Sequence, residues 1–423
     1  MISSQHIEKK IGRIKVKKIL FIVNYLILDE EGGNSRFMYL AKKLLAEGNV
    51  EIEIVTSNFL HAKKVFRLEN EKNIFIDNKA IKITFLSELG YKKNVSLKRT
   101  LSNKVFAKSV SKYLKSMKKN ENLPDVIYFS VPSLEYGNKV VNFARKNEIN
   151  TIADVQDIWP DAFEMVSPFP KIVNDILFFN SKRLSRNIYS KATRTIAVSN
   201  TYAEIIDKYR KNNVKTDVIY LGSDFKDFDK YFNKKNSKEN IIRFTYVGTL
   251  GHSYDLSQVF EAFKQIKDLK IEFEFHVFGD GPLRKTFEDK VVKLCLTDVV
   301  SFHGRLPYND LVGELGEMDV AINPIRDGAA QSIINKVGDY AAASLPVINT
   351  QENIEYRTLV KDYQIGINTI NDSNEIAKSL KEIISHRELI SKWGSNNRRL
   401  GNELFDRRQT YKYLCGIVLN TIS

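Results

Sequence analysis

The sequence predicts an α/β protein built from two doubly wound domains of similar size, each with a mostly parallel sheet covered by helices. Three observations lead to this prediction. The chain has 423 residues, which suggests two or three domains rather than one. Short apolar runs alternate with helical patterns along the chain, as in open α/β sheets. Glycine-rich turns follow several of these runs, and such sheets bind ligands at the carboxyl ends of their strands.

The first half of the chain begins this alternation. Residues 19–23 form an apolar run that predicts a buried first strand. The helix predicted over 34–47 repeats apolar residues on one face and ends before Gly48, a residue typical of helix C-termini. Further strands are predicted at 50–56, 125–130, 149–155 and 195–199.

The second half repeats the pattern after a polar stretch. Residues 224–240 have no clear period and predict a linker. Strands are then predicted at 241–247, 273–278, 299–303, 319–323 and 346–349, with helices near 256–266 and 283–296. We therefore expect an N-terminal domain at 1–222, with 1–15 as a poorly defined extension, a linker at 223–240 and a C-terminal domain at 241–395. A last helix within 396–423 is expected to pack back on the N-terminal domain.

The composition narrows the class of protein. A hydrophobic fraction of 43% and a charged fraction of 27% are ordinary for a globular chain and exclude wholesale disorder. The longest apolar runs fall short of the ~18 residues that a membrane-spanning helix needs. Cys295 and Cys415 are the only cysteines, so we expect no disulfide framework or metal cluster, and a reducing compartment.

The net charge of +14 is concentrated in the first half. Residues 1–222 hold 38 Lys and Arg against 23 Asp and Glu, whereas 223–423 hold 27 against 28. Between Glu88 and Glu121, ten basic residues occur without an acidic one. One predicted helical face of this segment carries Lys104, Lys108, Lys112, Lys115 and Lys119. Another is expected to carry Leu101, Val105, Tyr113, Leu114 and Met117. A basic amphipathic helix suggests an anionic membrane surface, and a merely solvated face is the alternative.

Three glycine turns follow predicted strands. The first, Gly-Gly-Asn-Ser at 32–35, precedes a helix, where backbone N–H groups and the helix dipole favour an anion. It could equally be a flexible loop with an ordinary helix cap. The others are Tyr-Val-Gly-Thr-Leu-Gly at 246–251 and Phe-Gly-Asp-Gly-Pro at 278–282. Neither of these matches the G-x-G-x-x-G fingerprint or a Walker loop, which disfavours ordinary dinucleotide binding.

The segment 331–340 is the most informative. Lys336 lies near a predicted helix start, and Asp339 follows three residues later on the same face. An ammonium offsets pyrophosphate charge, and a carboxylate accepts hydrogen bonds from two vicinal hydroxyls, so the pair could bind a phosphate and a ribose together. The alternative is a charge pair at a helix start, with Asp339 stabilising the first turn.

These residues resemble those of a known family. The run from 246 to 350 looks like the donor half of the family 4 retaining glycosyltransferases, which have the GT-B fold of two facing Rossmann-like domains. The similar motifs are G-x-L-G at 248–251, F-G-D-G-P at 278–282, F-H-G-R-L-P at 302–307 and N-K-V-G-D-Y at 335–340. In the first half, D-V-Q-D-I-W-P at 154–160 resembles the D-x-W-P motif of bacterial enzymes that build capsule, exopolysaccharide and O-antigen units.

The resemblance implies a nucleotide-sugar donor, with UDP favoured, on the second domain and an acceptor on the first. The acceptor would be a lipid-diphosphate-linked saccharide at the inner face of the cytoplasmic membrane, in a cytoplasmic, peripherally bound enzyme. Neither a metal nor another cofactor is expected. Association with other polysaccharide-assembly transferases is a further expectation.

Individual roles follow from the same resemblance. Asp339 falls where the family places the second Glu of its E-x7-E motif, on the ribose, and Gln331 where the first Glu contacts the sugar. Gly33 would let a loop approach the diphosphate. Backbone around 332–335, including Ser332 and Asn335, would meet the pyrophosphate or sugar together with Lys336. The remaining expected donor residues are Gly248 and Gly251, and, near the base, Gly279, Gly281 and Arg305.

The chain departs from the family pattern at several positions. Gln156 stands where many relatives have a histidine, and Gln331 and Asp339 both replace Glu. The Arg and Lys that many relatives carry after the first donor-domain strand are missing, since 248–252 reads Gly-Thr-Leu-Gly-His. Negative charge grows on a leaving diphosphate, so Lys336, the glycine-loop amides and His252 would have to balance it.

Retention in this family implies front-face attack, in which the leaving phosphate helps to deprotonate the acceptor hydroxyl. Asp157, at a predicted strand end, is a candidate to orient or deprotonate that hydroxyl, and an N-cap or loop salt bridge is the alternative. Two other function classes stay open. One is a non-catalytic partner or chaperone of another transferase, which the glutamines at 156 and 331 favour. The other, a nucleic-acid binder, ranks last because aromatic residues do not interleave with the basic run.

Overall fold

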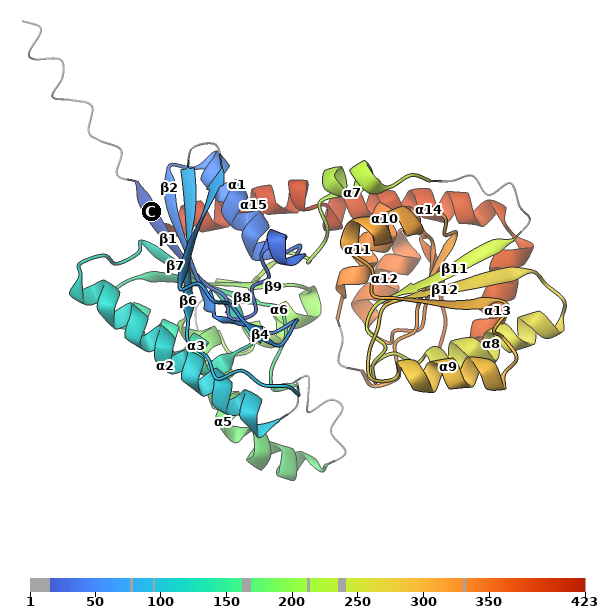
Figure 1. Ribbon diagram of the computed structural model, residues 1–423, viewed down its shortest axis with the longest axis horizontal. Helices are drawn as coiled ribbons and strands as arrows, with labels where there is room; N and C mark the ends of the chain where they lie inside the picture. Colours follow the sequence, from blue (N-terminus) through green and yellow to red (C-terminus); the bar gives the residue numbers. More distant parts are fainter. Residues whose placement is uncertain are drawn as a thin grey trace, which may run out of the picture. The chain divides into compact units, whose positions relative to one another are not determined.

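The computed structural model describes residues 16–76, 79–93, 96–161, 169–210, 214–234, 241–329 and 332–422 (Figure 1). The chain divides into two compact units. Unit 1 consists of Met1–Asp154, Asn187–Thr195 and Cys415–Ser423, and unit 2 of Val155–Arg186 and Ile196–Leu414. Each unit gathers separate stretches of chain, so neither coincides with one of the consecutive domains predicted from the sequence.

Unit 1 is built on strands in the order β8-β7-β1-β2-β6-β5. Their bounds are β1 (Lys17–Ile22), β2 (Val50–Ser57), β5 (Glu71–Ile76), β6 (Lys79–Leu86), β7 (Val126–Val131) and β8 (Asn150–Val155). β1 pairs in parallel with β2 and β7, and β2 with β6, whereas β5 is antiparallel to β6. The strands predicted at 19–23, 50–56, 125–130 and 149–155 are confirmed. β5 was not predicted, because its side chains are exposed or only half-buried and form no apolar run.

Two helices of unit 1, α1 and α2, begin at side chains that accept hydrogen bonds from N–H groups of their own first turn. Ser35 accepts from the N–H of Phe37 and starts α1 (Arg36–Glu47), which ends at Gly48 as predicted. Ser96 accepts from the N–H of Arg99 and starts α2 (Leu97–Lys119). The other short elements are η2 (Asp29–Glu31), β3 (Phe59–Leu60), β4 (Val65–Phe66) and α3 (Leu134–Lys146).

Unit 2 contains a six-stranded sheet in the order β13-β12-β11-β14-β15-β16, in which every pairing is parallel. Its strands are β11 (Ile242–Val247), β12 (Phe273–Phe278), β13 (Val300–Gly304), β14 (Val320–Asn323), β15 (Val347–Asn349) and β16 (Gly366–Asn368). The order runs outward in both directions from β11 and β14, which is the doubly wound arrangement that the sequence predicted. It places a topological switch point at the carboxyl ends of these two strands.

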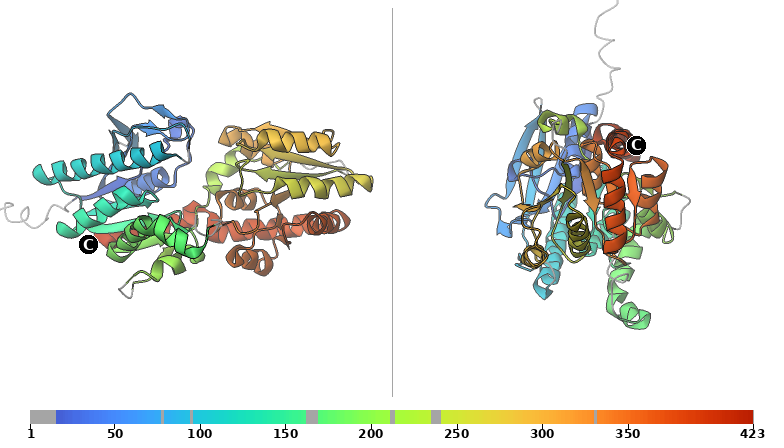
Figure 2. Two further views of the ribbon diagram at one scale, coloured as in Figure 1. Left: turned by 90° about the horizontal axis from the view of Figure 1, so that it is seen from below. Right: turned by 90° about the vertical axis from the view of Figure 1, so that its right-hand side faces the viewer.

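Helices cover both faces of this sheet (Figure 1 and Figure 2). Phe244 and Phe275 belong to one core, packed with α8, α9 and α13, whereas Val247 and Ala321 belong to another, packed with α7, α10, α11 and α12. The helices are α7 (Phe225–Tyr231), α8 (Leu256–Asp268), α9 (Arg284–Lys293), α10 (Tyr308–Leu315), α11 (Asn335–Ala342), α12 (Ile354–Asp362), α13 (Ser373–Ser385) and α14 (Glu388–Leu400). The remaining elements are α5 (Lys171–Lys191), β9 (Arg194–Ala197), α6 (Asn200–Asp207), β10 (Asp217–Val218), the π-helix η3 (Gly401–Phe405) and α15 (Arg407–Ile422).

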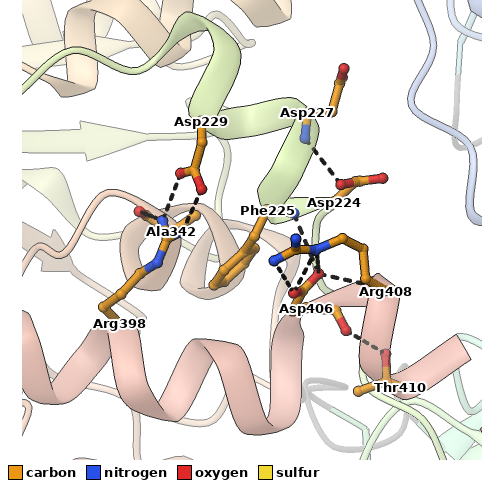
Figure 3. A network of polar contacts seen from close by, with 9 residues as sticks. All are labelled: Asp224, Phe225, Asp227, Asp229, Ala342, Arg398, Asp406, Arg408 and Thr410. Carbon is orange, nitrogen blue, oxygen red and sulfur yellow. Dashed lines mark hydrogen bonds and ion pairs between the residues drawn. The ribbon is translucent and has the colours of Figure 1, made fainter.

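The polar stretch predicted as a linker contains the helix α7. Polar contacts hold α7 to α14 and to the residue before α15 (Figure 3). Asp224 caps α7, and Phe225 and Phe228 on its inner face are fully buried. The Arg398 guanidinium lies 4.7 Å from the centre of the Phe225 ring and pairs with Asp229 at 2.7 Å. At the start of α15, Arg408 pairs with the buried Asp406. The sequence did not predict α7 as a helix, because only two of its apolar side chains, Phe225 and Phe228, are buried.

Candidate functional site

A cavity of about 620 Å³ opens at the carboxyl end of β11 in unit 2. We call it the polar cavity. The loop after β8 contributes Gln156, Asp157 and Trp159, and the segment around the start of α11 contributes residues 332–336 and Asp339. The other lining residues are Val198, Tyr202, Leu221, Val247, Gly248, Thr249, Ser253 and Tyr254. Six residues predicted for the site thus line one cavity: Asp157, Gly248, Ser332, Asn335, Lys336 and Asp339.

Lys336 brings its ammonium into the polar cavity, where no described carboxylate forms an ion pair with it. Its side chain is buried, and its Nζ lies 4.0 Å and 3.9 Å from the ring centres of Tyr246 and Tyr254. This Nζ has no hydrogen-bond partner among the described residues. Burial holds the pKa of Lys336 well below its ordinary value. The two aromatic faces stabilise the ammonium in part, and an anion bound in the cavity would stabilise it further.

Gly248 keeps the backbone close to this ammonium. Its φ is +147°, and a Cβ built on it would lie 3.1 Å from Lys336 Nζ and 3.0 Å from the Tyr246 hydroxyl. The preceding residue is anchored as well, because the Val247 N–H donates to the Tyr340 hydroxyl at 2.9 Å. This contact connects the end of β11 to α11, the helix that carries Lys336. A side chain at 248 would occupy the space beside the ammonium.

Asp339 is held in place by two hydroxyl groups. Its Oδ1 accepts from Ser223 Oγ at 2.6 Å and from Tyr308 OH at 2.8 Å. Oδ2 accepts no hydrogen bond from the part of the chain that the structure describes. Burial raises the pKa of Asp339, while the two hydrogen bonds and Arg407 lower it. The carboxylate is therefore oriented, with one oxygen left for a ligand hydroxyl.

The loop after β8 adds a carboxylate and an amide to the same cavity. Asp157 Oδ2 accepts from Trp159 Nε1 at 2.8 Å, and burial raises the pKa of Asp157. Asp157 makes no ion pair with any described residue, which disfavours the salt-bridge alternative. Gln156 Nε2 and Ser332 Oγ are buried and lack partners among the described residues. The cavity thus offers three unused donors, counting Lys336 Nζ, to a polyhydroxyl or anionic ligand.

Tyr202 reaches the polar cavity from α6, whose start is fixed by Glu355. The Glu355 carboxylate accepts from the N–H groups of Asn200 and Thr201 at 2.8 Å and 2.9 Å. It also accepts from the Tyr220 hydroxyl at 2.7 Å. A carboxylate at a helix N-terminus interacts favourably with the helix dipole. This contact could not be predicted from local patterns, because Asn200 and Glu355 lie 155 residues apart.

A second cavity of about 580 Å³ shares Val247, Gly248 and Thr249 with the first. We call it the glycine cavity. Gly279, Gly281 and the exposed Arg305 line it, as do Phe278, Asp280, Leu306 and Leu311. A Cβ on Gly279 would lie 1.8 Å from Gly248 O, and one on Gly281 would lie 2.4 Å from Leu250 O. These two glycines are therefore required by the packing of one loop against another, which shapes the cavity wall.

Three predicted positions, Gly251, His252 and Gly33, lie elsewhere. Gly251 and the exposed His252 are not among the residues that line either cavity. Gly33 belongs to unit 1, where a Cβ would lie 2.6 Å from the Ile27 side chain, so packing alone accounts for a glycine there. Gln331 falls outside the described residues. Within those residues, no group of three or more His, Cys, Asp and Glu side chains is arranged to hold a metal ion.

The predicted basic face lies on α2 in unit 1. Lys104, Lys108, Lys112 and Lys115 are all exposed. The opposite face buries Phe106, Val110, Leu114 and Met117 among others. The expectation that Leu101 belongs to this apolar face is wrong, because its side chain is exposed; it lies in the first turns of α2, before the buried stretch begins.

Sequence comparison connects part of the chain to a family. Residues 227–400 match the family model described as glycosyl transferases group 1. An uncharacterized glycosyltransferase of Methanocaldococcus jannaschii is 22% identical over 253 residues, which is 56% of this chain and 61% of that protein. The chain thus matches about three fifths of the length of this relative. These matches support a glycosyltransferase.

Structural comparison shows the fold. HepE of Anabaena, solved in complex with UDP, superposes with a TM-score of 0.66 at 13% identity, covering 95% of this chain and 100% of that one. WaaG, a glycosyltransferase involved in lipopolysaccharide biosynthesis, has a TM-score of 0.66 at 15% identity, covering 94% of this chain and 99% of that one. The predicted fold class is confirmed: the chain has two Rossmann-like halves of the GT-B type.

Proposed function

We propose that the chain transfers a sugar, with retention of anomeric configuration, from a nucleotide sugar to a lipid-diphosphate-linked saccharide in the synthesis of a bacterial surface polysaccharide. The observation that carries this proposal is the buried ammonium of Lys336, which lies beside the Gly248 backbone and has no anionic partner among the described residues. A buried charge of this kind needs a ligand of opposite charge. The diphosphate of a nucleotide sugar supplies one.

The remaining parts of a nucleotide sugar fit the neighbouring groups. Asp339 presents an oriented carboxylate to the ribose hydroxyls, and the glycine cavity, with Arg305 at its edge, would take the base. Ser332 and Gln156 supply donors for the sugar or the phosphates. UDP is the nucleotide we favour, and the HepE complex with UDP supports a nucleotide-sugar partner.

In the proposed reaction, the bond between the anomeric carbon and the phosphate oxygen breaks, and its electron pair leaves with the diphosphate. An acceptor hydroxyl forms the new bond on the same face of the sugar. Its proton passes to the departing phosphate oxygen or to Asp157. The Lys336 ammonium then offsets the charge that grows on the diphosphate, as fixed charges do in preorganised sites.

Replacing Lys336 tests the donor site. In the Lys336→Met variant, we expect the Kd for UDP to rise about ten- to hundredfold, because a charge-assisted contact to the diphosphate is lost. Isothermal titration calorimetry measures this change, with the exposed Lys361→Met as the matched control. An unchanged Kd in Lys336→Met would show that the diphosphate does not bind in this cavity.

Replacing Asp157 tests the acceptor step. An asparagine keeps an oxygen for the Trp159 N–H but cannot take a proton, so Asp157→Asn should lower kcat roughly a hundredfold or more. The Kd for UDP should not change, because Asp157 is assigned to the acceptor. The assay uses a lipid-linked acceptor, with the product linkage read by NMR. Full activity in Asp157→Asn contradicts the assigned role, and an inverted anomeric product contradicts retention.

A non-catalytic partner of another transferase is the second candidate. The glutamine at 156 favours it, because a neutral amide cannot exchange protons as a histidine does. A thermal-shift screen with UDP- and GDP-sugars separates the two candidates. Stabilisation by one nucleotide sugar together with product formation supports the enzyme, whereas no response to any of them supports the partner role.

A further inference from the structure

The first half of α5 exposes a continuous set of large apolar side chains. The exposed fractions of Ile172, Val173, Ile176, Leu177 and Phe179 are 75, 39, 74, 60 and 68%. We call these five side chains the apolar face of α5. Exposed apolar residues scattered singly are normal, but a contiguous group marks a surface that binds another apolar surface. α5 is the green helix in the lower part of Figure 1.

The spacing of these residues makes the apolar face a property of the helix itself. Positions 172, 176 and 179, with 173 and 177 beside them, recur at intervals of three and four residues, which places them along one side of the helix. Asn174 is buried on the other side. The later turns bury Ser185, Ile188 and Tyr189, so the helix is packed at one end and exposes its apolar side at the other.

The charges of α5 indicate what covers the apolar face. The helix contains Lys171, Lys182, Arg183, Arg186 and Lys191 against a single acidic residue, Asp175. Asp175 pairs with Lys182 at 2.6 Å, which leaves the exposed Lys171, Arg183 and Arg186 to set the sign of the surface. An apolar face bordered by positive charge complements the interface of a bilayer that contains anionic lipid.

The side chains also favour lipid over a protein partner. The apolar face consists only of Ile, Val, Leu and Phe, which carry no hydrogen-bonding group. Protein interfaces concentrate their binding energy in Trp, Tyr and Arg, which combine apolar area with polar contacts. We propose that the apolar face of α5 inserts into the interface of an anionic bilayer, with α5 lying along the membrane surface.

This inference deepens the proposed function, because it assigns residues that hold a transferase at the membrane of its lipid-linked acceptor. Binding to vesicles needs neither donor nor acceptor. A failure of vesicle binding would therefore leave the donor-site proposal intact, and a failure of UDP binding would leave the membrane proposal intact.

The test is flotation of the full-length protein with vesicles of 30% phosphatidylglycerol in phosphatidylcholine, at low and at high salt. In the variant Ile172→Ser, Ile176→Ser, Phe179→Ser, we expect the partition coefficient to fall about tenfold or more, and salt-resistant binding to disappear. The matched control is Leu269→Ser, Val292→Ser, Ile370→Ser, which removes three apolar side chains of similar exposure elsewhere in unit 2. The control should bind like the unchanged protein.

A second measurement locates the side chain directly. In Ile176→Trp, addition of the same vesicles should shift tryptophan emission to the blue and allow quenching by brominated lipid, beyond the signal of the unchanged protein. Equal vesicle binding by the two triple variants, or no response of the new tryptophan, would overturn the proposal. Light scattering gives a further test. If the unchanged protein and the control are dimers whereas the α5 variant is a monomer, the proposal is overturned in favour of a second copy of the chain as the partner of this face.

Discussion

Lys336 is an ammonium that unit 2 buries between two tyrosine rings before any ligand is bound. Its lowered pKa means that the unfolded chain binds this proton more tightly than the folded chain does. Such a site lowers the stability of the ligand-free protein, because the energy needed to desolvate the charge is recovered only when an anion binds. The sequence predicts that Lys336 belongs to the site, but only the structure shows that its Nζ has no hydrogen-bond partner among the described residues.

This burial predicts how stability depends on pH. Between the lowered pKa of Lys336 and its ordinary value of 10.5, the unfolded chain holds a proton that the folded chain has lost. The free energy of unfolding should therefore rise with pH in this window, by up to about 1.4 kcal/mol per pH unit. At lower pH the charge is present in both states and its burial destabilises the fold.

Urea denaturation of the unchanged protein and of Lys336→Met, at several pH values from 7 to 10, measures this contribution. Lys336→Met should be the more stable of the two at neutral pH, and the difference should shrink as the pH rises. A constant difference across the range would contradict a lowered pKa. Other titrating groups are common to both proteins and cancel in the comparison.

At the scale of elements, the loops after β11 and β12 pack against each other through their backbones. The Gly248 N–H donates to Phe278 O at 2.9 Å, and the Gly279 N–H donates to Gly304 O at 2.7 Å. Gly279 has a φ of +139° and no room for a side chain. The glycines were predicted to give a ligand access, and the structure adds that they let three strand ends meet closely.

Gly279→Ala should therefore disturb both cavities. The added Cβ would lie 1.8 Å from Gly248 O, so one loop must move, and we expect a loss of about 2 kcal/mol in stability together with weaker UDP binding. Gly251→Ala is the matched control, since its Cβ meets only Thr249 Cγ2, at 3.6 Å. Thermal melting and UDP titration of both variants test this. Equal effects of the two substitutions would mean that the loop contact is unimportant.

At the scale of the whole molecule, the charge of +14 and a pI of about 9.3 favour binding to anionic surfaces. The exposed lysines of α2 are part of this excess. None of the described helices has both the length and the apolar content needed to cross a membrane.

Charge reversal on α2 should weaken vesicle binding in a salt-dependent way. We expect Lys108→Glu, Lys112→Glu, Lys115→Glu to lower the partition onto anionic vesicles about tenfold or more at low salt, since each lysine near such a surface contributes roughly 1 kcal/mol. The difference from the unchanged protein should vanish near 0.5 M salt, because the Debye length becomes short. Unchanged binding at low salt would show that this face is merely solvated.

The sequence was sufficient for the parts of the fold that local patterns encode. The apolar run at 19–23 became β1, because a strand buried on both faces needs an uninterrupted apolar run, whereas 273–278, which is interrupted by Glu274 and His276, became the partly exposed β12. Gly48 marked the C-terminal end of α1, because glycine is typical of helix C-termini. α7 and β5 were not predicted. Only two buried phenylalanines hold α7 in place, and β5 is held by pairing with one neighbouring strand, β6.

The sequence by itself determined the fold class, the charge asymmetry and the residue types of the candidate site, including Lys336 and Asp339. Only the tertiary structure decided how those residues are used. Ser223 and Tyr308, 116 and 31 residues from Asp339, orient its carboxylate, and Tyr254 covers the Lys336 ammonium. Likewise, the apolar pattern of α5 fits a buried helix, and its exposure depends on what packs against it. Propensity and periodicity act between near neighbours, whereas orientation, burial and missing partners arise from contacts between distant segments.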